Sequence, residues 1–367
     1  MGLYVHIPFC IKKCAYCDFY SLSLKSLHEN YIDALNKQMK NLSKVYSDRF
    51  FDTVYIGGGT PTILDAQRLG VLLTSVFQNF NIDKNAEITI EANPATLDEQ
   101  KLKALLSGGV NRLSIGCQSA VDSELKTLGR SHSFAEFVET YELARSAGFD
   151  NISVDLMYAI PNQTLETFKY SLESVARLAP EHISLYGLKI EPNTLFYKNR
   201  DKLAFPDEDE FCMMYLEAGK YLSSLGYSKY EISNFSKAGY ESHHNIKYWK
   251  MQDYLGLGPG AHSFIDGRRF AYSRDVRGYI KAVEEDREPD YSENCIISAN
   301  DLLNEEFMLN MRLITGYDMD GRLALDEEKL SLFEKHGYIA RHDNNIRFTD
   351  NGFLVSNYLL SELTNFD

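Results

Sequence analysis

The chain has 367 residues, of which 44% are hydrophobic and 25% are charged, and this balance is typical of a folded globular protein. Its formal net charge of -14 would repel nucleic acid and anionic membranes, which argues against a protein that primarily binds DNA or RNA. No apolar run is long enough to span a bilayer and the first ten residues lack the layout of a secretory signal, so we expect a cytoplasmic protein.

The first half of the chain alternates between short apolar runs and amphipathic stretches. The apolar runs indicate buried strands, and the amphipathic stretches indicate helices. Strands are expected at 3–7, 53–56, 87–90, 112–115, 152–157 and 183–188, and helices between them at 31–45, 66–77, 98–106, 134–147 and 165–178. This alternation predicts parallel βαβ units that form either an open sheet or a barrel.

Polar residues and glycines collect where these expected strands end. They are Cys10, the glycines at 57–59, Glu91, Gln118 and Asp155. Because parallel strands bring their carboxyl ends to one rim, and barrels and open sheets both carry function there, we expect these residues to form one site.

The pattern changes in the second half of the chain. We expect an acidic helix over 206–225, an extended piece over 229–234, a loop rich in His, Gly and aromatic residues over 243–264, and then two helical stretches with a hairpin over 338–349 that turns at Asn344-Asn345. The last elements predict a small winged-helix-like α+β module. The expected domains are 1–235 and 298–367, joined by a connecting segment over 236–297.

Three of the six cysteines, Cys10, Cys14 and Cys17, lie within eight positions. In a reducing compartment such crowding indicates metal or redox chemistry rather than disulfide bonds. Three thiolates from one loop can hold a 4Fe-4S cluster and leave one iron open, which S-adenosylmethionine can chelate. Zinc is the alternative, although zinc sites usually use two separated pairs of ligands. Cys117 and Cys212 are expected to be small core residues, and the sequence says nothing about Cys295.

The cysteine motif, preceded by Tyr4-Val5-His6-Ile7-Pro8-Phe9, resembles that of the radical S-adenosylmethionine (SAM) superfamily. Within it, the chain resembles the group that contains the oxygen-independent coproporphyrinogen oxidases and the HemW haem chaperones. The resemblance extends through Gly58-Gly59-Thr60-Pro61-Thr62 to the C-terminal module. It implies an α/β fold with a partial parallel (β/α)6 barrel, a HemN-like C-terminal module, and a 4Fe-4S cluster with S-adenosylmethionine as cofactors.

The resemblance also implies a shell of residues around S-adenosylmethionine. An aromatic ring can pack on the adenine, glycines allow close approach to the backbone, and carboxylate and guanidinium groups can pair with the methionine end. Each such residue alone could instead be a turn, a cap or a surface ion pair, but their order and convergence favour a site. The matching positions are Tyr4, Tyr16, Gly58, Gly59, Thr60, Glu91, Gln118, Arg130 and Asp155.

Two departures from the oxidases favour the HemW branch. The motif of the oxidases has a further cysteine two residues after the third cysteine, where this chain has Phe19. The oxidases also have an N-terminal extension before the motif, which is missing here. The stretch His244–Trp249 matches the HemW-like pattern HNxxYW, which implies that His244 binds haem iron, with His243 as the alternative ligand. Alternatively, these residues only form hydrogen bonds and pack a domain contact.

The resemblance therefore implies a carrier that binds haem and passes it to an acceptor protein, which the sequence does not identify. The alternatives are an oxidative decarboxylase of coproporphyrinogen III and a radical enzyme that acts on another substrate. A flavodoxin or a ferredoxin would suit as electron donor, and no nucleic-acid partner is expected.

Overall fold

The computed structural model describes residues 1–364, which form a twelve-stranded sheet and a separate three-stranded sheet. Six neighbouring strands of the large sheet run parallel in chain order and make up a partial barrel. All six strands expected from the sequence are confirmed, and so is the α/β class. They are β1 (Gly2–Ile7), β2 (Phe50–Gly58), β3 (Asn81–Ala92), β4 (Arg112–Gln118), β5 (Ile152–Tyr158) and β6 (His182–Gly187).

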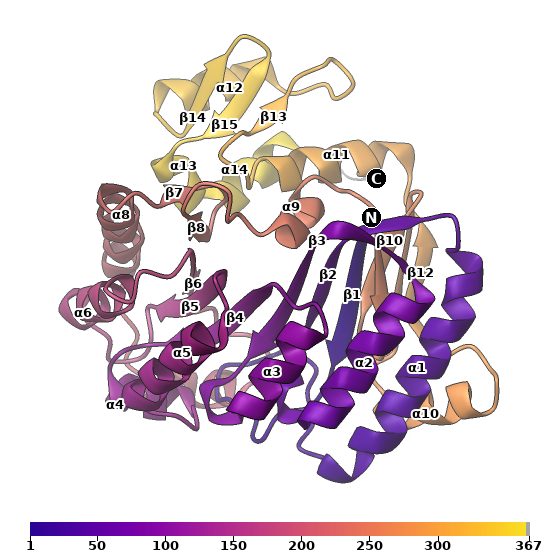
Figure 1. The fold of residues 1–367 in the computed structure, drawn as a ribbon. Helices are drawn as coiled ribbons and strands as arrows, with labels where there is room; N and C mark the ends of the chain where they lie inside the picture. The colour runs from indigo at the N-terminus through magenta and orange to yellow at the C-terminus, as the bar shows by residue number, and fades with distance from the viewer. Residues whose placement is uncertain (365–367) are drawn as a thin grey trace.

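Helices between these strands cover the outer face of the sheet (Figure 1). The helix α2 shows why they form: Asp65 caps it by accepting the Arg68 N–H, and Leu69, Leu72 and Val76 recur on one face and are buried. The expected helices are confirmed. The helices of this region are α1 (His28–Val45), α2 (Ala66–Asn79), α3 (Glu99–Ser107), α4 (Asp122–Leu128), α5 (Phe134–Ala147), α6 (Leu165–Ala176) and α7 (Leu195–Asn199), with 3-10 turns at Lys25–Leu27, Pro61–Ile63, Pro94–Thr96 and Arg200–Lys202.

The acidic helix expected after the barrel is confirmed as α8 (Glu208–Ser224), and Asp207 and Glu210 form a capping box at its start. Two short antiparallel strands, β7 (Ser228–Lys229) and β8 (Asn234–Ser236), then extend the sheet beyond β6.

The loop expected over 243–264 is wrong, because this stretch holds a helix and two strands. Helix α9 (His243–Trp249) is followed by β9 (Tyr254–Leu257) and β10 (His262–Ile265), and β11 (Arg268–Tyr272), α10 (Val276–Glu284) and β12 (Tyr291–Ile296) complete the segment. β9 pairs in parallel with β1, so the segment expected to be a connection continues the main sheet. Four-residue strands interrupted by glycine are too short to show strand periodicity in the sequence.

The C-terminal module has more elements than the two helices and hairpin that the sequence indicates. It contains α11 (Ala299–Asn310), β13 (Tyr317–Asp318), α12 (Glu327–Lys335), β14 (Ile339–His342), β15 (Asn345–Phe348), α13 (Asp350–Leu354) and α14 (Ser356–Leu363). The hairpin β14–β15 is confirmed, but its turn lies one residue earlier than expected. Asp343 takes the positive φ of the turn, 52°, and Asn345 already pairs with His342.

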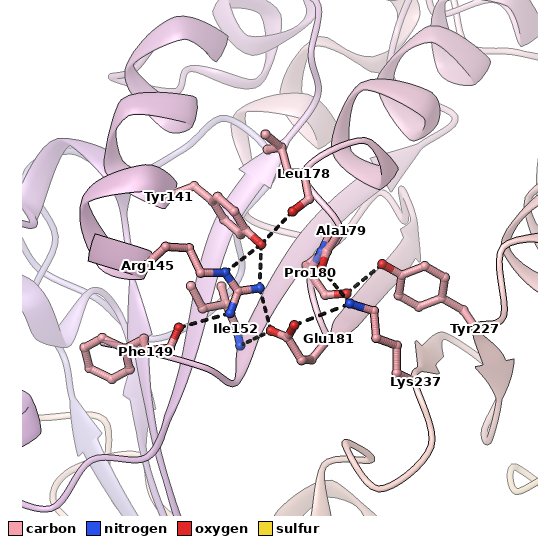
Figure 2. Close-up of polar contacts among 10 residues, drawn as sticks. All are labelled: Tyr141, Arg145, Phe149, Ile152, Leu178, Ala179, Pro180, Glu181, Tyr227 and Lys237. Carbon is pink, nitrogen blue, oxygen red and sulfur yellow. Dashed lines mark hydrogen bonds and ion pairs between the residues drawn. The ribbon is translucent and has the colours of Figure 1, made fainter. Parts of the chain in front are cut away.

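A polar network ties together the amino ends of β5 and β6 (Figure 2). The Glu181 carboxylate accepts hydrogen bonds from Arg145 at 2.6 Å and from the Ile152 N–H at 3.1 Å, and it pairs with Lys237 at 3.4 Å. Arg145 also donates to the Tyr141 hydroxyl. The network fixes the end of the sheet that lies opposite the carboxyl-end rim.

Among residues 1–364, no helix combines the length and the apolar character needed to cross a membrane.

Candidate functional site

A pocket opens at the carboxyl ends of β1 to β5, and it gathers residues from the cysteine loop and from each strand end. The expected convergence on one rim is confirmed, since eleven of the thirteen residues singled out in the sequence line this pocket. They are Cys10, Cys14, Tyr16, Cys17, Gly58, Gly59, Thr60, Glu91, Gln118, Arg130 and Asp155.

The loop that carries the three cysteines is held at both ends and in its middle. The Cys10 N–H donates to Leu22 O at 3.0 Å where the loop closes, and the Ala15 N–H donates to Leu128 O at 3.0 Å. Phe9 anchors the start of the loop, since its ring is fully buried. These contacts hold the three thiols over the strand ends.

Arg130 links the rim to the cysteine loop. Its guanidinium donates to Gly116 O at 2.8 Å and lies 3.8 Å from the Cys14 sulfur, while its buried Nε has no partner among the described residues. Burial raises the pKa of the Cys17 thiol to about 11, so this thiol is protonated in the protein alone. Cationic iron lowers the pKa of a thiol that it binds and so favours the thiolate.

The three thiols line the pocket without converging on one point. In the part of the chain that the structure describes, no group of three or more His, Cys, Asp or Glu side chains is arranged to hold a metal ion. A four-iron cluster spreads its ligands more widely than a single ion does, so this arrangement suits a cluster better than the zinc alternative.

The glycine segment after β2 is crowded by the cysteine loop. Gly58 has a φ of +115°, and a Cβ at Gly59 would lie 2.6 Å from Phe9 O. The N–H groups of Gly58, Gly59 and Thr60 all donate within the protein, to Glu91, Ile7 O and Phe9 O. The segment therefore offers a ligand no free N–H at these three positions, and Thr60 O and the Thr60 hydroxyl also have partners, the Ile63 N–H at 3.0 Å and the Cys10 sulfur at 3.5 Å.

Two partly buried carboxyl groups face the pocket. Glu91 accepts the Tyr55 hydroxyl at 2.9 Å and the Gly58 N–H at 3.0 Å, and burial raises its pKa to about 7. Burial also raises the pKa of Asp155, which accepts the Ser114 hydroxyl at 3.3 Å. A cationic or hydrogen-bond-donating ligand would stabilise the charged form of both groups.

Tyr4 lies outside this pocket, in an adjoining one that shares Phe19, Gly58 and Glu91 with it. The Tyr4 hydroxyl bonds to His6 Nδ1 at 2.9 Å. Tyr4 therefore belongs to the neighbouring cavity rather than to the shell that lines the cysteine pocket.

His244 is not brought to the rim. It is 1% exposed on α9, its Nδ1 bonds to Thr53 Oγ1 at 2.8 Å, and its Nε2 bonds to the Tyr248 hydroxyl at 2.8 Å. Thr53 lies in the first half of β2, away from the carboxyl end of this strand. Figure 1 shows α9 near the N-terminus, at the amino ends of the strands. This geometry disagrees with the expected iron ligand, because neither ring nitrogen is free. His243 is exposed but lies on the same helix.

Three residues that line the second pocket were not predicted from the sequence. Tyr20, His262 and Arg274 meet there, although they come from segments far apart in the chain. Phe19 was noted only as a departure from the oxidases, whereas its ring is 70% exposed and lines both pockets. No sequence pattern pointed to them, since their proximity depends on the pairing of β9 with β1 and of β10 with β9.

Residues 4–175 match the family described as the radical SAM superfamily. The chain is 37% identical to the haem chaperone HemW of Escherichia coli (strain K12), over 98% of this chain and 97% of that protein. It is also 37% identical to HemW of Bacillus subtilis (strain 168), over 85% of this chain and 83% of that protein.

A solved structure shares the fold. Coproporphyrinogen III oxidase (HemN) from Escherichia coli, a radical SAM enzyme, superposes with a TM-score of 0.85 at 24% identity and covers 98% of this chain and 89% of its own. At this identity the likeness shows the architecture alone.

Proposed function

Because the chain belongs to the HemW family of the radical SAM superfamily, we propose that it is a haem chaperone, which binds haem and transfers it to an acceptor protein. The observation that carries this proposal is the identity of 37% to HemW of Escherichia coli over nearly the whole of both chains. Phe19 supports the chaperone proposal, since the motif of the oxidases has a cysteine at that position.

Cys10, Cys14 and Cys17 would hold a 4Fe-4S cluster. The thiol donors, the nearby guanidinium of Arg130 and the glycines beneath the loop fit such a group. When bound, the cluster supplies one electron to S-adenosylmethionine.

The rim residues would bind and orient S-adenosylmethionine. Asp155 and Glu91 would accept hydrogen bonds from its hydroxyl or ammonium groups, and these contacts would offset the cost of burying their charge. The unpartnered Nε of Arg130 is available to a carboxylate, and Tyr16 lines the same pocket with a ring that can pack on adenine. The loop and the strand ends together would keep water from the bound molecule.

The second candidate function is oxidative decarboxylation of coproporphyrinogen III, which the shared fold with HemN keeps open. That reaction needs a reduced porphyrinogen near the cluster and a route for an electron. Phe19, an exposed aromatic ring beside the cluster pocket, offers no further thiol at that place.

All six cysteines are free, which suits a reducing compartment such as the cytoplasm. An electron donor of the flavodoxin or ferredoxin type would reduce the cluster.

Anaerobic reconstitution followed by haem titration and a decarboxylation assay tests this function. The wild-type protein should bind about one haem, as expected for a single axial-ligand site, and should form no protoporphyrinogen IX from coproporphyrinogen III. Multiple-turnover decarboxylation would overturn the carrier proposal, and so would a complete failure to bind haem.

A further inference from the structure

The second pocket lies beside the cluster pocket, with a volume of about 330 Å³. The two cavities share Phe19, Gly58 and Glu91, so a ligand in the second would lie next to one in the first. Its size is at the low end of the range for small-molecule sites, roughly 300–1,000 Å³, so a macrocycle bound there would stay partly outside. Partial exposure suits a cargo that must leave.

Two histidines line this pocket, and they differ in what their ring nitrogens do. His6 is buried, its Nδ1 bonds to the Tyr4 hydroxyl at 2.9 Å and its Nε2 bonds to Tyr20 O at 3.1 Å. The His262 side chain is 52% exposed, and its ring makes no hydrogen bond to any residue of 1–364. Only His262 can therefore offer a nitrogen to a ligand without breaking an existing bond.

The carboxylate of Glu293 lies next to the His262 ring. Its Nδ1 lies 3.7 Å from Glu293 Oε2, across the β11 strand that separates β10 from β12. Histidines that bind metals almost always donate their second ring N–H to a carboxylate, a carbonyl or water, which fixes the tautomer. Since Nδ1 faces Glu293, Nε2 is the ring nitrogen left for a ligand, and a small shift of the ring on binding would bring Nδ1–H within hydrogen-bond distance of the carboxylate.

The remaining lining suits a flat aromatic dianion. Tyr20, Tyr248 and Tyr254 supply rings, and Phe19 adds an exposed ring at the border with the cluster pocket. Arg274 is exposed and has no hydrogen-bond or ion-pair partner among the described residues, so its guanidinium is available to a carboxylate.

We propose that haem binds in this second pocket, with its iron on Nε2 of His262 and a propionate at Arg274. This inference rests on the proposed haem-carrier function and assigns the site of its cargo. It places the haem beside the cluster pocket, in a cavity lined by Tyr248, the hydrogen-bond partner of His244, and not on His244 itself.

Haem titration of the full-length, anaerobically reconstituted protein tests the assignment, with the absorption spectrum as readout. His262→Ala should lose the wild-type Soret band, and Glu293→Gln should weaken binding by about tenfold or more, because it removes the carboxylate that faces Nδ1. Arg274→Gln should weaken binding without a change of axial ligand. The matched control is His342→Ala, an exposed histidine on β14, which should match the wild type.

A change of fold is excluded by a rescue experiment. His262→Gly should recover a histidine-like spectrum when imidazole is added, whereas His342→Gly should not respond. If the wild type binds haem and His262→Ala has the same spectrum and affinity, the assignment is overturned while the carrier function stands. If the wild type binds no haem, the proposed function itself fails.

Discussion

The guanidinium of Arg130 lies 3.8 Å from the sulfur of Cys14, although 116 residues separate the two in the chain. It also holds Gly116 O, so it joins the cysteine loop to the end of β4. Arg130→Met should weaken S-adenosylmethionine binding by about tenfold or more, the scale of a lost charged hydrogen bond. Calorimetry on the reconstituted protein measures this, with the exposed Arg200→Met as control. Equal affinities in all three proteins would contradict a role for Arg130 in binding.

Cys14→Ala should abolish the broad iron-sulfur absorption and the paramagnetic signal of the reduced cluster, because three thiolates must act together. Cys212→Ala is the matched control, since Cys212 lies on α8 and does not line the cluster pocket. Iron analysis and electron paramagnetic resonance report the result. A normal four-iron cluster in Cys14→Ala would rule out the assignment, and stoichiometric zinc without iron in the wild type would favour the zinc site.

Gly59→Val should reduce both iron content and S-adenosylmethionine binding. A Cβ at this position would lie 2.6 Å from Phe9 O, next to Cys10, so the whole loop must move.

Asp155→Asn should weaken S-adenosylmethionine binding while iron content stays normal, because Asp155 touches the pocket and not the loop. Iron and binding assays on both variants separate the effects, and normal iron with normal binding in Gly59→Val would show that the loop tolerates the shift.

The stability of the fold should depend on pH through Glu231, which does not line the cluster pocket. It is fully buried, burial raises its pKa from 4.5 to about 7, and its Oε2 has no partner among the described residues. The folded state therefore holds the proton more tightly than the unfolded state. The resulting stability is present in full below pH 4.5 and is lost as the pH rises through about 7.

Glu231→Gln keeps a neutral side chain, so its unfolding free energy should not show this loss. The wild type should lose up to roughly 3 kcal/mol relative to the variant across this range. Urea unfolding on both sides of the range measures the difference. Parallel pH profiles for the two proteins would mean that Glu231 does not titrate there.

The network in Figure 2 should matter for stability and not for binding. Glu181→Gln leaves Arg145 without its carboxylate, which should destabilise the fold by about 2–3 kcal/mol, somewhat less than for a fully buried pair. Tyr227→Phe removes one hydrogen bond to Pro180 O and should cost about 1 kcal/mol. Denaturant midpoints test both values, and a loss of S-adenosylmethionine affinity in folded Glu181→Gln would contradict a purely structural role.

The barrel was predictable from the sequence because its parallel strands are buried on both faces and appear as continuous apolar runs. The convergence of the rim residues follows from the same geometry, since each lies where such a run ends. The strands β9 to β12 were missed for the opposite reason. They are short, and β12 is largely exposed, so neither length nor periodicity marks them.

His244 shows that a sequence motif does not determine whether a histidine is free to bind a ligand. The pattern around it indicates which residue types recur, but whether an imidazole is free depends on Thr53 and Tyr248, which the fold brings to its two nitrogens. His262 has no motif of this kind, and its exposure beside Arg274 becomes visible only once β9 is paired with β1 and β10 with β9.

The pairing of β1 with β9 has a consequence for how the chain folds during synthesis. β1 leaves the ribosome well before β9, yet one of its edges stays unpaired until Tyr254 can meet Gly2. Contacts at such sequence separation are slow to form, and an open strand edge invites association with other chains. The nascent protein must therefore keep β1 protected until β9 has been made, and truncation before β9 should leave a product prone to aggregation.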